Sequence, residues 1–355
     1  MKKLSASLLL CLALLLAACD GDLVITGKLV SAHTDESTGN VLYTIYTDEG
    51  KSILVTLAEH GFLHEWPEAV EENALHSGEL SGTFVTAYCD RVQTSVSLPD
   101  GESARAYSAS VIMVDALQFD NAAFLADGTP LRITQYRFDA RTRYSLTDGT
   151  ELLIEGQPTG PENVYVGGVE SFDDLTPAAQ KKVRAYYENQ GLLYDVEEIL
   201  ERAYAACLTH DSEENFNSLF VEQSIAPTAS SEQIMYFTTV IARPLSGRYM
   251  YEERLGAAFD RKTGEYISTF DLFTCAENEI LPHLLDLAKI TDETLRAEMA
   301  AVFAPENIIF LPDHIELWFT QGTLPSEPYS FGFSLSYDDA LRSLLAEHAI
   351  PKSNN

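Results

Sequence analysis

Runs of β-branched and aromatic residues, separated by short polar turns that contain Gly, Asp or Asn, dominate the chain as far as residue 117. Such runs are typical of β-strands joined by hairpins. The clearest are residues 23–30, 41–46, 52–57, 78–85 and 108–117. This pattern predicts about five or six strands in a small antiparallel barrel or sandwich, with an OB-like barrel as the first choice.

The pattern changes after residue 122. Turn signals punctuate residues 122–168, where we expect short strands. Thr176 can cap a helix that has Pro177 in its first turn and Gly191 beyond its end. Asp195 can cap a second helix, because apolar residues recur at the helical period as far as Cys207.

The last third of the chain alternates between strand and helix patterns. Strands are expected at residues 233–242, 249–259, 307–311, 315–319 and 329–335, and helices at 279–288, 292–303 and 337–347. This order predicts helices packed on one face of an antiparallel sheet. The fold class predicted for the whole chain is therefore α+β, with a β-rich domain over residues 19–118 and an α+β domain over residues 119–355.

A motif in the last third resembles a known family. Residues 258–273 contain a strand ending in Phe-Asp, a Thr-Gly turn, a short second strand and an Asp-Leu-Phe sequence. Together with residues 306–311 and 328–337, this pattern resembles the uncharacterised extracytoplasmic domain of the lysozyme-sensing anti-sigma factor, which also occurs beside peptidoglycan deacetylase domains. The likeness covers residues 233–345 and implies a partner of the lysozyme or cell-wall class, without indicating binding residues. In physical terms we expect Gly264 to form the turn, Asp271 to cap the next turn and Leu272 to be buried.

The N-terminus predicts export. Lys2 and Lys3 precede an apolar run over residues 8–18, which is shorter than the about 20 residues of a membrane-spanning helix and ends in small residues. Residues 1–18 are therefore a predicted signal peptide. The sequence Leu-Ala-Ala-Cys resembles the bacterial lipobox, which implies cleavage before Cys19 and attachment of a diacylglyceryl group, with acyl chains such as palmitate, to its thiol. A protein held at the cell membrane by this lipid is expected; an ordinary signal peptide with a coincidental cysteine is the alternative.

The charge composition of the chain restricts the classes of molecule that the protein is expected to bind. The 355 residues include 23 Lys and Arg against 54 Asp and Glu, a formal net charge of −31, which argues against binding to nucleic acid or to an anionic membrane surface. An apolar fraction of 46% provides a core and excludes general disorder. The acidic balance favours cationic partners such as lysozyme-like proteins, basic peptides or divalent ions.

The cysteines do not predict a disulfide framework. Cys11 belongs to the signal peptide, and Cys89, Cys207 and Cys275 are far apart in the sequence. At most one bridge could form among these three, and we expect three buried thiols.

Two short motifs could hold a metal ion. His60 and His64 form an HxxxH motif, and Asp173-Asp174 resembles the Asp-Asp element of metal-dependent polysaccharide deacetylases. Brought together around zinc, they would form a hydrolase site. The alternative is that Asp173 and Asp174 begin a helix, since carboxylates near a helix N-terminus interact favourably with its dipole.

Other polar groups are weaker candidates. Glu59, Glu65 and His76 could join the two histidines in a zinc or pH-sensing cluster, with a helical turn bearing exposed histidines as the alternative. Acidic and amide side chains alternate over residues 211–217 as in a calcium-binding loop, but Phe216 stands where such a loop needs Gly. A solvated linker is therefore expected there.

No motif indicates catalysis. Trp66 and Trp318 could line a sugar-binding platform or belong to the core. The chain has no G-x-S-x-G, P-loop or dinucleotide-binding motif. We therefore predict a lipid-anchored protein without enzymatic activity or cofactor that binds or senses a protein or cell-wall ligand. A metal-dependent cell-wall hydrolase or deacetylase and a structural module of an envelope complex are the alternatives.

Overall fold

The computed structural model describes residues 23–34, 40–64, 83–98, 101–136, 139–210, 216–246 and 249–352. Contacts divide the chain into two compact units, residues 1–150 and residues 151–355. Strands make up 48% and helices 23% of the structure. Within the described ranges, no helix is both long and apolar enough to cross a membrane.

Among these residues, most strands belong to one large sheet. Twelve strands are hydrogen-bonded in the order β12-β11-β10-β9-β8-β7-β6-β5-β3-β2-β1-β4, and three more form the small sheet β13-β14-β15. The large sheet is mixed, because β3 pairs with β5 and β8 pairs with β9 in parallel. The predicted fold class, a small N-terminal barrel followed by an α+β domain with helices on one face of an antiparallel sheet, is therefore wrong.

The first unit contains strands β1 (Leu23–Thr34), β2 (Val41–Tyr46), β3 (Ser52–His64), β4 (Phe84–Ser97), β5 (Ser103–Phe124), β6 (Pro130–Tyr136) and β7 (Asp139–Leu146). Strand β1 pairs with β2 and β4, β2 pairs with β3, and β5 pairs with β3 and β4, so the first five strands pair in a closed circuit. Apolar residues of these strands form one core cluster, which includes Ile25, Tyr43, Val55, Ala87 and Ile112.

Strand β5 explains why this circuit does not end as a small domain of its own. The apolar pattern predicts a strand that ends at residue 117, but β5 continues to Phe124 and its last part pairs with β6. Polar residues interrupt the pattern without ending the strand. Gln118 is only 6% exposed, and Asp120 accepts a hydrogen bond of 2.5 Å from Arg132 on β6.

The second unit contains strands β8 (Glu151–Gly156), β9 (Leu219–Ser230), β10 (Ile234–Ser246), β11 (Tyr249–Asp260) and β12 (Tyr266–Ile267). The small sheet is made of β13 (Ile308–Phe310), β14 (His314–Phe319) and β15 (Phe331–Ser336). The helices are α3 (Pro177–Gln190), α4 (Val196–Leu208), α5 (Glu277–Leu287), α6 (Glu293–Val302) and α7 (Asp339–Leu344). Short 3-10 turns are η1 (Phe172–Asp174), η2 (Thr269–Leu272), η3 (Pro305–Asn307) and η4 (Glu347–Ala349).

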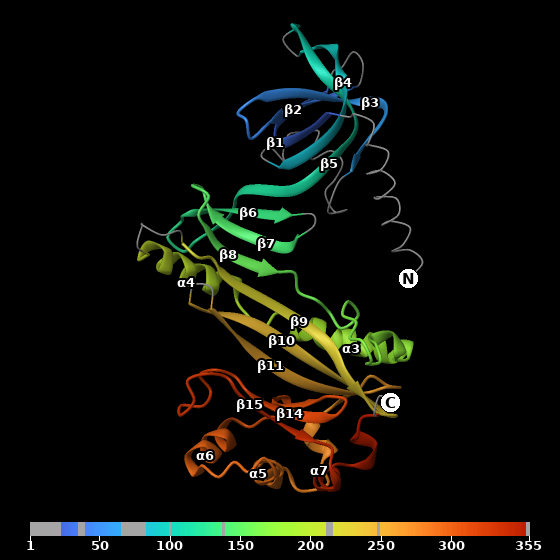
Figure 1. The fold of residues 1–355 in the computed structure, drawn as a ribbon, viewed down its shortest axis with the longest axis vertical. Helices are drawn as coiled ribbons and strands as arrows, with labels where there is room; N and C mark the ends of the chain where they lie inside the picture. Colours follow the sequence, from blue (N-terminus) through green and yellow to red (C-terminus); the bar gives the residue numbers. More distant parts are fainter. Residues whose placement is uncertain are drawn as a thin grey trace. The chain divides into compact units, whose positions relative to one another are not determined.

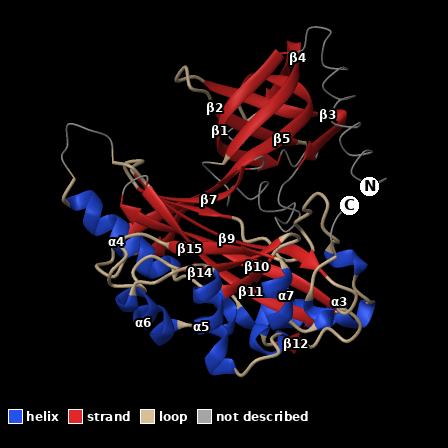
Figure 2. Ribbon diagram, turned by 60° about the horizontal axis from the view of Figure 1, so that its bottom comes forward, coloured by secondary structure: helices blue, strands red, loops and turns tan. Residues whose placement is uncertain are grey.

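Alternation along β10 sends apolar side chains to both faces of the sheet. Met235 and Phe237 pack with Val183 of α3 in one cluster. Ile234 and Tyr236 belong to another cluster, which includes the small sheet and helices α5, α6 and α7. The small sheet lies between strands β9–β11 and these three helices (Figures 1 and 2). Helix α3 therefore covers one face of the large sheet, and the small sheet, backed by α5, α6 and α7, covers the other face, which corrects the expected single helical layer.

The predicted helix boundaries are confirmed where capping residues mark them. Thr176 accepts a hydrogen bond from the Ala179 N–H at 3.2 Å, and Asp195 accepts bonds from the first turn of α4. Gly191 ends α3 with a φ of +66°. The expected cap at Asp271 is wrong, because it lies inside η2 and Ser268 accepts the capping bond from the Phe270 N–H at 3.3 Å.

Candidate functional site

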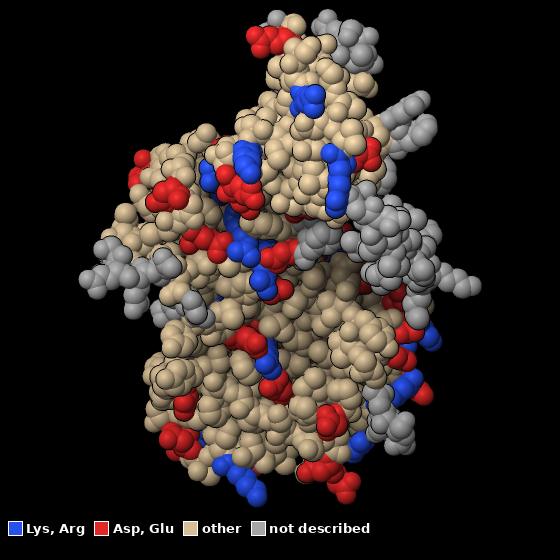
Figure 3. Space-filling model, turned by 45° about the horizontal axis from the view of Figure 1, so that its top comes forward, with Lys and Arg blue, Asp and Glu red and all other residues tan. Residues whose placement is uncertain are grey.

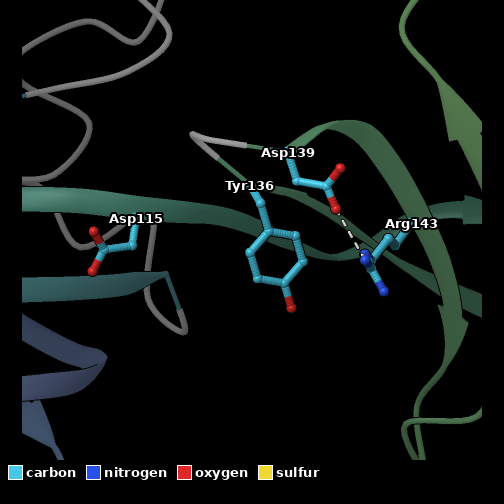
Figure 4. A pocket seen from close by; sticks show the side chains of 4 residues that line it. All are labelled: Asp115, Tyr136, Asp139 and Arg143. Carbon is cyan, nitrogen blue, oxygen red and sulfur yellow. Dashed lines mark hydrogen bonds and ion pairs between the residues drawn. The ribbon is translucent and has the colours of Figure 1, made fainter. Parts of the chain in front are cut away.

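A hollow in the first unit is the best candidate for a functional site. Its volume is about 500 Å3, and it is lined by Asp115, Tyr136, Asp139 and Arg143 (Figure 4). These residues come from three adjacent strands, β5, β6 and β7. Pockets that hold small ligands have volumes of roughly 300–1,000 Å3, so the hollow is of a suitable size.

Irregularities in the strand pairing position the side chains of Asp115 and Asp139 in the hollow. Phe84 of β4 pairs with Ala116, whereas the next residue, Val85, pairs with Val114, so β5 carries one extra residue at this point, Asp115. Such a bulge redirects the side chain of the extra residue and commonly lies beside binding sites. The register also shifts beside Asp139, which pairs with Tyr136.

Hydrogen bonds fix the carboxylates. Asp115 Oδ2 accepts a hydrogen bond from Thr86 Oγ1 at 2.5 Å. Arg143 Nη2 donates to Asp139 Oδ2 at 3.0 Å, and Arg141 Nε lies 3.4 Å from Asp139 Oδ1. Asp139 thus forms ion pairs with two arginines, Arg141 and Arg143. Of these two, Arg143 lines the hollow.

Tyr136 is held by a cation–π contact. The Arg143 guanidinium carbon lies 5.2 Å from the centre of the Tyr136 ring, within the range in which the ring quadrupole attracts a cation. Asp115 lies at one end of the hollow, Asp139 and Arg143 lie at the other, and the Tyr136 ring lies between them (Figure 4). The site thus has a carboxylate at one end, the Asp139–Arg143 ion pair at the other and an aromatic ring between them.

Sequence analysis did not identify any of these four residues. They lie outside every short motif, because β5, β6 and β7 bring them together only through strand pairing. The only local signal is the alternation of Asp139, Arg141 and Arg143, which puts charges at every second position of a strand.

The proposed zinc residues are not brought together by the described contacts. His60 and His64 lie in strand β3 and not in a helical turn, and their side chains, like that of Glu59, lie outside the description. Asp174 Oδ2 accepts hydrogen bonds from Ser171 N at 2.7 Å and Ser171 Oγ at 3.2 Å. Asp174 therefore stabilises the short turn η1 before α3, as the alternative interpretation expects.

Several other candidates fall outside the described residues, namely Cys11, Cys19, Glu65, Trp66, His76, Asp211, Glu213 and Asn215. Within the part of the chain that the structure covers, no group of three or more His, Cys, Asp and Glu side chains is arranged to hold a metal ion.

The three body cysteines form no disulfide with one another. Cys89 is buried, as expected, but Cys207 and Cys275 are only partly buried. The expectation of three buried thiols is therefore wrong for two of them.

Trp318 joins the two sheets of the second unit. The Arg254 guanidinium carbon lies 4.2 Å from the centre of a Trp318 ring, and Trp318 Nε1 donates to the Glu252 carbonyl at 3.2 Å. Arg254 is also bound to the Glu252 carboxylate at 2.7 Å and to Glu316 at 3.1 Å. The indole therefore connects β14 to β11, and the Arg254 guanidinium occupies one face of its ring.

Comparison with known proteins gives few relatives. No family model and no curated protein matches the chain. A solved structure of a DUF3298 family member from Bacteroides fragilis is similar, with 13% identity, a TM-score of 0.36 and coverage of 66% of this chain and 93% of that one. A DUF3298 family protein from Pseudomonas aeruginosa has 11% identity, a TM-score of 0.30 and coverage of 66% and 94%. Both neighbours are bacterial proteins of one uncharacterised family, and they provide no link to a lysozyme-sensing anti-sigma factor.

Proposed function

We propose that this protein is a lipid-anchored binding protein of the bacterial envelope, which recognises a protein or cell-wall ligand outside the cell. The hollow in the first unit carries the proposal. It combines a volume of about 500 Å3 with two carboxylates, a guanidinium and an aromatic ring. Strands hold all four side chains, and a site built on regular elements keeps its geometry more accurately than one built on loops.

Sequence features support the location and the class of partner. The predicted signal peptide and the Leu-Ala-Ala-Cys sequence favour export and acylation of Cys19. The net charge of −31 favours partners that carry positive charge. The resemblance of residues 233–345 to the extracytoplasmic domain of the lysozyme-sensing anti-sigma factor suggests lysozyme-like proteins and peptidoglycan as the first partners to test.

The charge distribution bears on how such a partner would be recognised. On the face drawn in Figure 3, acidic and basic side chains are interspersed and do not form a single acidic patch. Recognition through specific side chains is therefore favoured over attraction by net charge alone.

The anchor is tested by labelling cells with a fatty acid analogue. The protein should carry the label and fractionate with membranes. The variant Cys19→Ala should lose both properties, while Cys11→Ala is the matched control and should retain them. Unlabelled protein recovered from the cytoplasm would refute the anchor.

Binding is tested by titrating the full chain in detergent with lysozyme and, separately, with soluble peptidoglycan fragments. Saturable binding to either supports the proposed function. Absence of saturable binding to both would refute it.

A further inference from the structure

We infer that the outward face of strands β1, β2 and β3 (blue in Figure 1) binds a saccharide that carries a carboxylate. The Lys28 ammonium would bind the carboxylate, the Tyr46 ring would pack against a sugar ring, and the Ser52 hydroxyl would bond to the sugar hydroxyls. This inference goes beyond the proposed function, because it concerns a different surface from the hollow and names a carbohydrate as the ligand.

The strand register places these side chains in one row. Lys28 of β1 pairs with Tyr46 of β2, Tyr46 pairs with Ser52 of β3, and on its other side Lys28 pairs with Phe84 of β4. Residues that lie directly opposite each other on antiparallel strands share a face of the sheet. The resulting row is Phe84, Lys28, Tyr46 and Ser52. Because neighbouring strands are about 4.8 Å apart, the backbones at Lys28 and Ser52 are separated by roughly 10 Å, which suits a disaccharide.

The row lies on the face that points away from the core. Leu29, Ile45 and Ile53, which form the adjacent row, pack in the core cluster of the first unit. Successive residues of a strand point to opposite faces of the sheet. Tyr46 is accordingly 47% exposed, and Ser52 is exposed as well. A ligand can therefore reach the row from solvent.

In the described part of the chain, Lys28 is held on this face without a carboxylate partner. The side chain is partly exposed, and its Nζ atom lies 5.0 Å from the centre of the Phe84 ring, within the range of a cation–π contact. The ring restrains the ammonium group but does not neutralise its charge. A carboxylate complements this group, because an ammonium donates charge-assisted hydrogen bonds to it.

The surroundings of Lys28 favour an anion. The chain has 54 Asp and Glu residues. The strands of this face contain none of them over residues 23–34, 41–46 and 52–57. In the turn after β2, Glu49 is already paired with Lys51 at 2.7 Å. A ligand carboxylate at Lys28 therefore meets no acidic side chain from these strands, although the net charge of the chain is −31.

The other side chains of this face suit a sugar. A sugar ring has an apolar face, which packs against an aromatic ring such as that of Tyr46, and hydroxyl groups at its edge. In the next outward row, Ser31 Oγ donates a hydrogen bond to Thr44 Oγ1 at 3.0 Å, so the Thr44 hydroxyl keeps its own donor for a ligand. Carboxylated saccharides have two sources outside a bacterial cell, the muramic acid of the cell wall and polymers of uronic acids.

The test is a calorimetric titration of the full chain at low ionic strength, in a detergent without a sugar headgroup. The probes are digalacturonic acid, its dimethyl ester, acetate, and the cell-wall disaccharide of N-acetylglucosamine and N-acetylmuramic acid. Digalacturonic acid should bind saturably, and its ester should bind roughly tenfold or more weakly, because the ester lacks the charge-assisted hydrogen bond. Acetate should bind more weakly than digalacturonic acid, because it has no ring to pack against Tyr46. Tighter binding of the cell-wall disaccharide would identify muramic acid as the source, and tighter binding of digalacturonic acid would identify uronic acids.

Variants connect each part of the ligand to its residue. Lys28→Met keeps the aliphatic stem and should weaken binding of digalacturonic acid roughly tenfold while leaving binding of the ester unchanged. Lys28→Arg keeps the charge and should retain the preference for the acid over the ester. Tyr46→Ser should weaken both ligands, because both pack against the ring. Lys51→Met is the matched control, since Lys51 is paired with Glu49 in the neighbouring turn, and it should bind digalacturonic acid normally.

Equal affinities of the wild-type protein for digalacturonic acid and its ester would overturn the inference, as would unchanged binding of the acid in Lys28→Met. The first comparison uses only the wild-type protein, so it decides the inference even if a variant fails to fold. If no saccharide probe binds while lysozyme or peptidoglycan fragments do, only this inference fails. If digalacturonic acid binds while lysozyme and peptidoglycan fragments do not, this inference stands and the proposed function fails.

Discussion

Gly264, in the turn between β11 and β12, lies against the backbone of Ala179 in α3. A Cβ atom at position 264 would stand 2.6 Å from both the Cα and the carbonyl oxygen of Ala179. Gly264 also has a φ of +71°, which only Gly adopts at little cost. In the same turn, the Lys262 carbonyl accepts a hydrogen bond of 2.7 Å from Thr176 Oγ1. The Thr-Gly turn is therefore the point at which the sheet holds the start of α3.

Replacing Gly264 by Ala should destabilise the second unit more than the backbone conformation alone explains. We expect Gly264→Ala to lower the free energy of unfolding by about 2–4 kcal/mol, because the left-handed conformation and the forced shift of α3 both oppose it. Gly322→Ala is the matched control, since Gly322 has a φ of +87° and nothing within 4 Å. The free energy of unfolding of the Gly322→Ala variant should fall by about 1–2 kcal/mol. Urea denaturation followed by circular dichroism measures both, and equal losses would contradict the role of the Ala179 contact.

The Arg254 contacts should contribute more to stability than an exposed ion pair. Arg254→Met loses two carboxylate partners and the charge over Trp318, and we expect a loss of about 1–2 kcal/mol because the group is partly buried. Lys182→Met is the control, because Lys182 and Glu265 form an ion pair with exposed side chains. Exposed pairs contribute about 0–1 kcal/mol. A larger loss in the control than in Arg254→Met would refute this ranking.

Asp260 should make the second unit sensitive to acid. Partial burial opposes ionisation of this carboxylate, but hydrogen bonds from Thr263 and Lys262 outweigh it and lower its pKa. A lowered folded-state pKa gives stability that is present above the unfolded-state pKa and is lost as pH falls through the folded-state value. The contribution should be small, about 0.5 kcal/mol, because these hydrogen bonds lie at the solvent-exposed surface, where water screens the charge. As the pH is lowered from about 7 to about 3, the free energy of unfolding of Asp260→Asn, measured by urea denaturation, should therefore decrease less than that of the wild type. Equal decreases in the two proteins would contradict this prediction.

Thiol labelling should distinguish the cysteines. Cys89 is only 1% exposed, and burial raises the pKa of the Cys275 thiol, so both should react slowly with iodoacetamide at neutral pH because the thiolate is the reactive form. Raising the pH should accelerate labelling of Cys275 while Cys89 remains protected. Mass spectrometry of the folded and the urea-unfolded protein provides the comparison. Rapid labelling of Cys89 in the folded protein would indicate that the pairing of β1 with β4 opens readily.

Local patterns predicted local structure well. Polar side chains with a clear capping role, such as Thr176 and Asp195, marked the helix starts correctly. Gly264 occupies the predicted turn, and Leu272 is fully buried as expected. These features depend on contacts between residues that are close in the sequence, so a single sequence contains the necessary information.

Long-range pairing could not be predicted in the same way. The apolar pattern ends a strand at residue 117, yet β6 provides partners that allow β5 to continue through Gln118 and Asp120. The hollow depends on the same pairing, because Asp115, Tyr136 and Arg143 lie on successive strands and meet only when the register is known. A bulge such as the one at Asp115 leaves no signature in the amino-acid pattern.

The parallel pairing of β8 with β9 determines when the second unit can assemble. Leu153 lies opposite Leu219, but helices α3 and α4 separate these two residues in the chain. While the chain is being synthesised from its N-terminus, the edge of β8 stays without this partner until both helices and β9 have been made. A chain cut short before Leu219 would keep that edge exposed, and exposed strand edges invite aggregation and attack by proteases. Survival of the newly made chain therefore depends on how soon synthesis reaches β9 after β8 has formed.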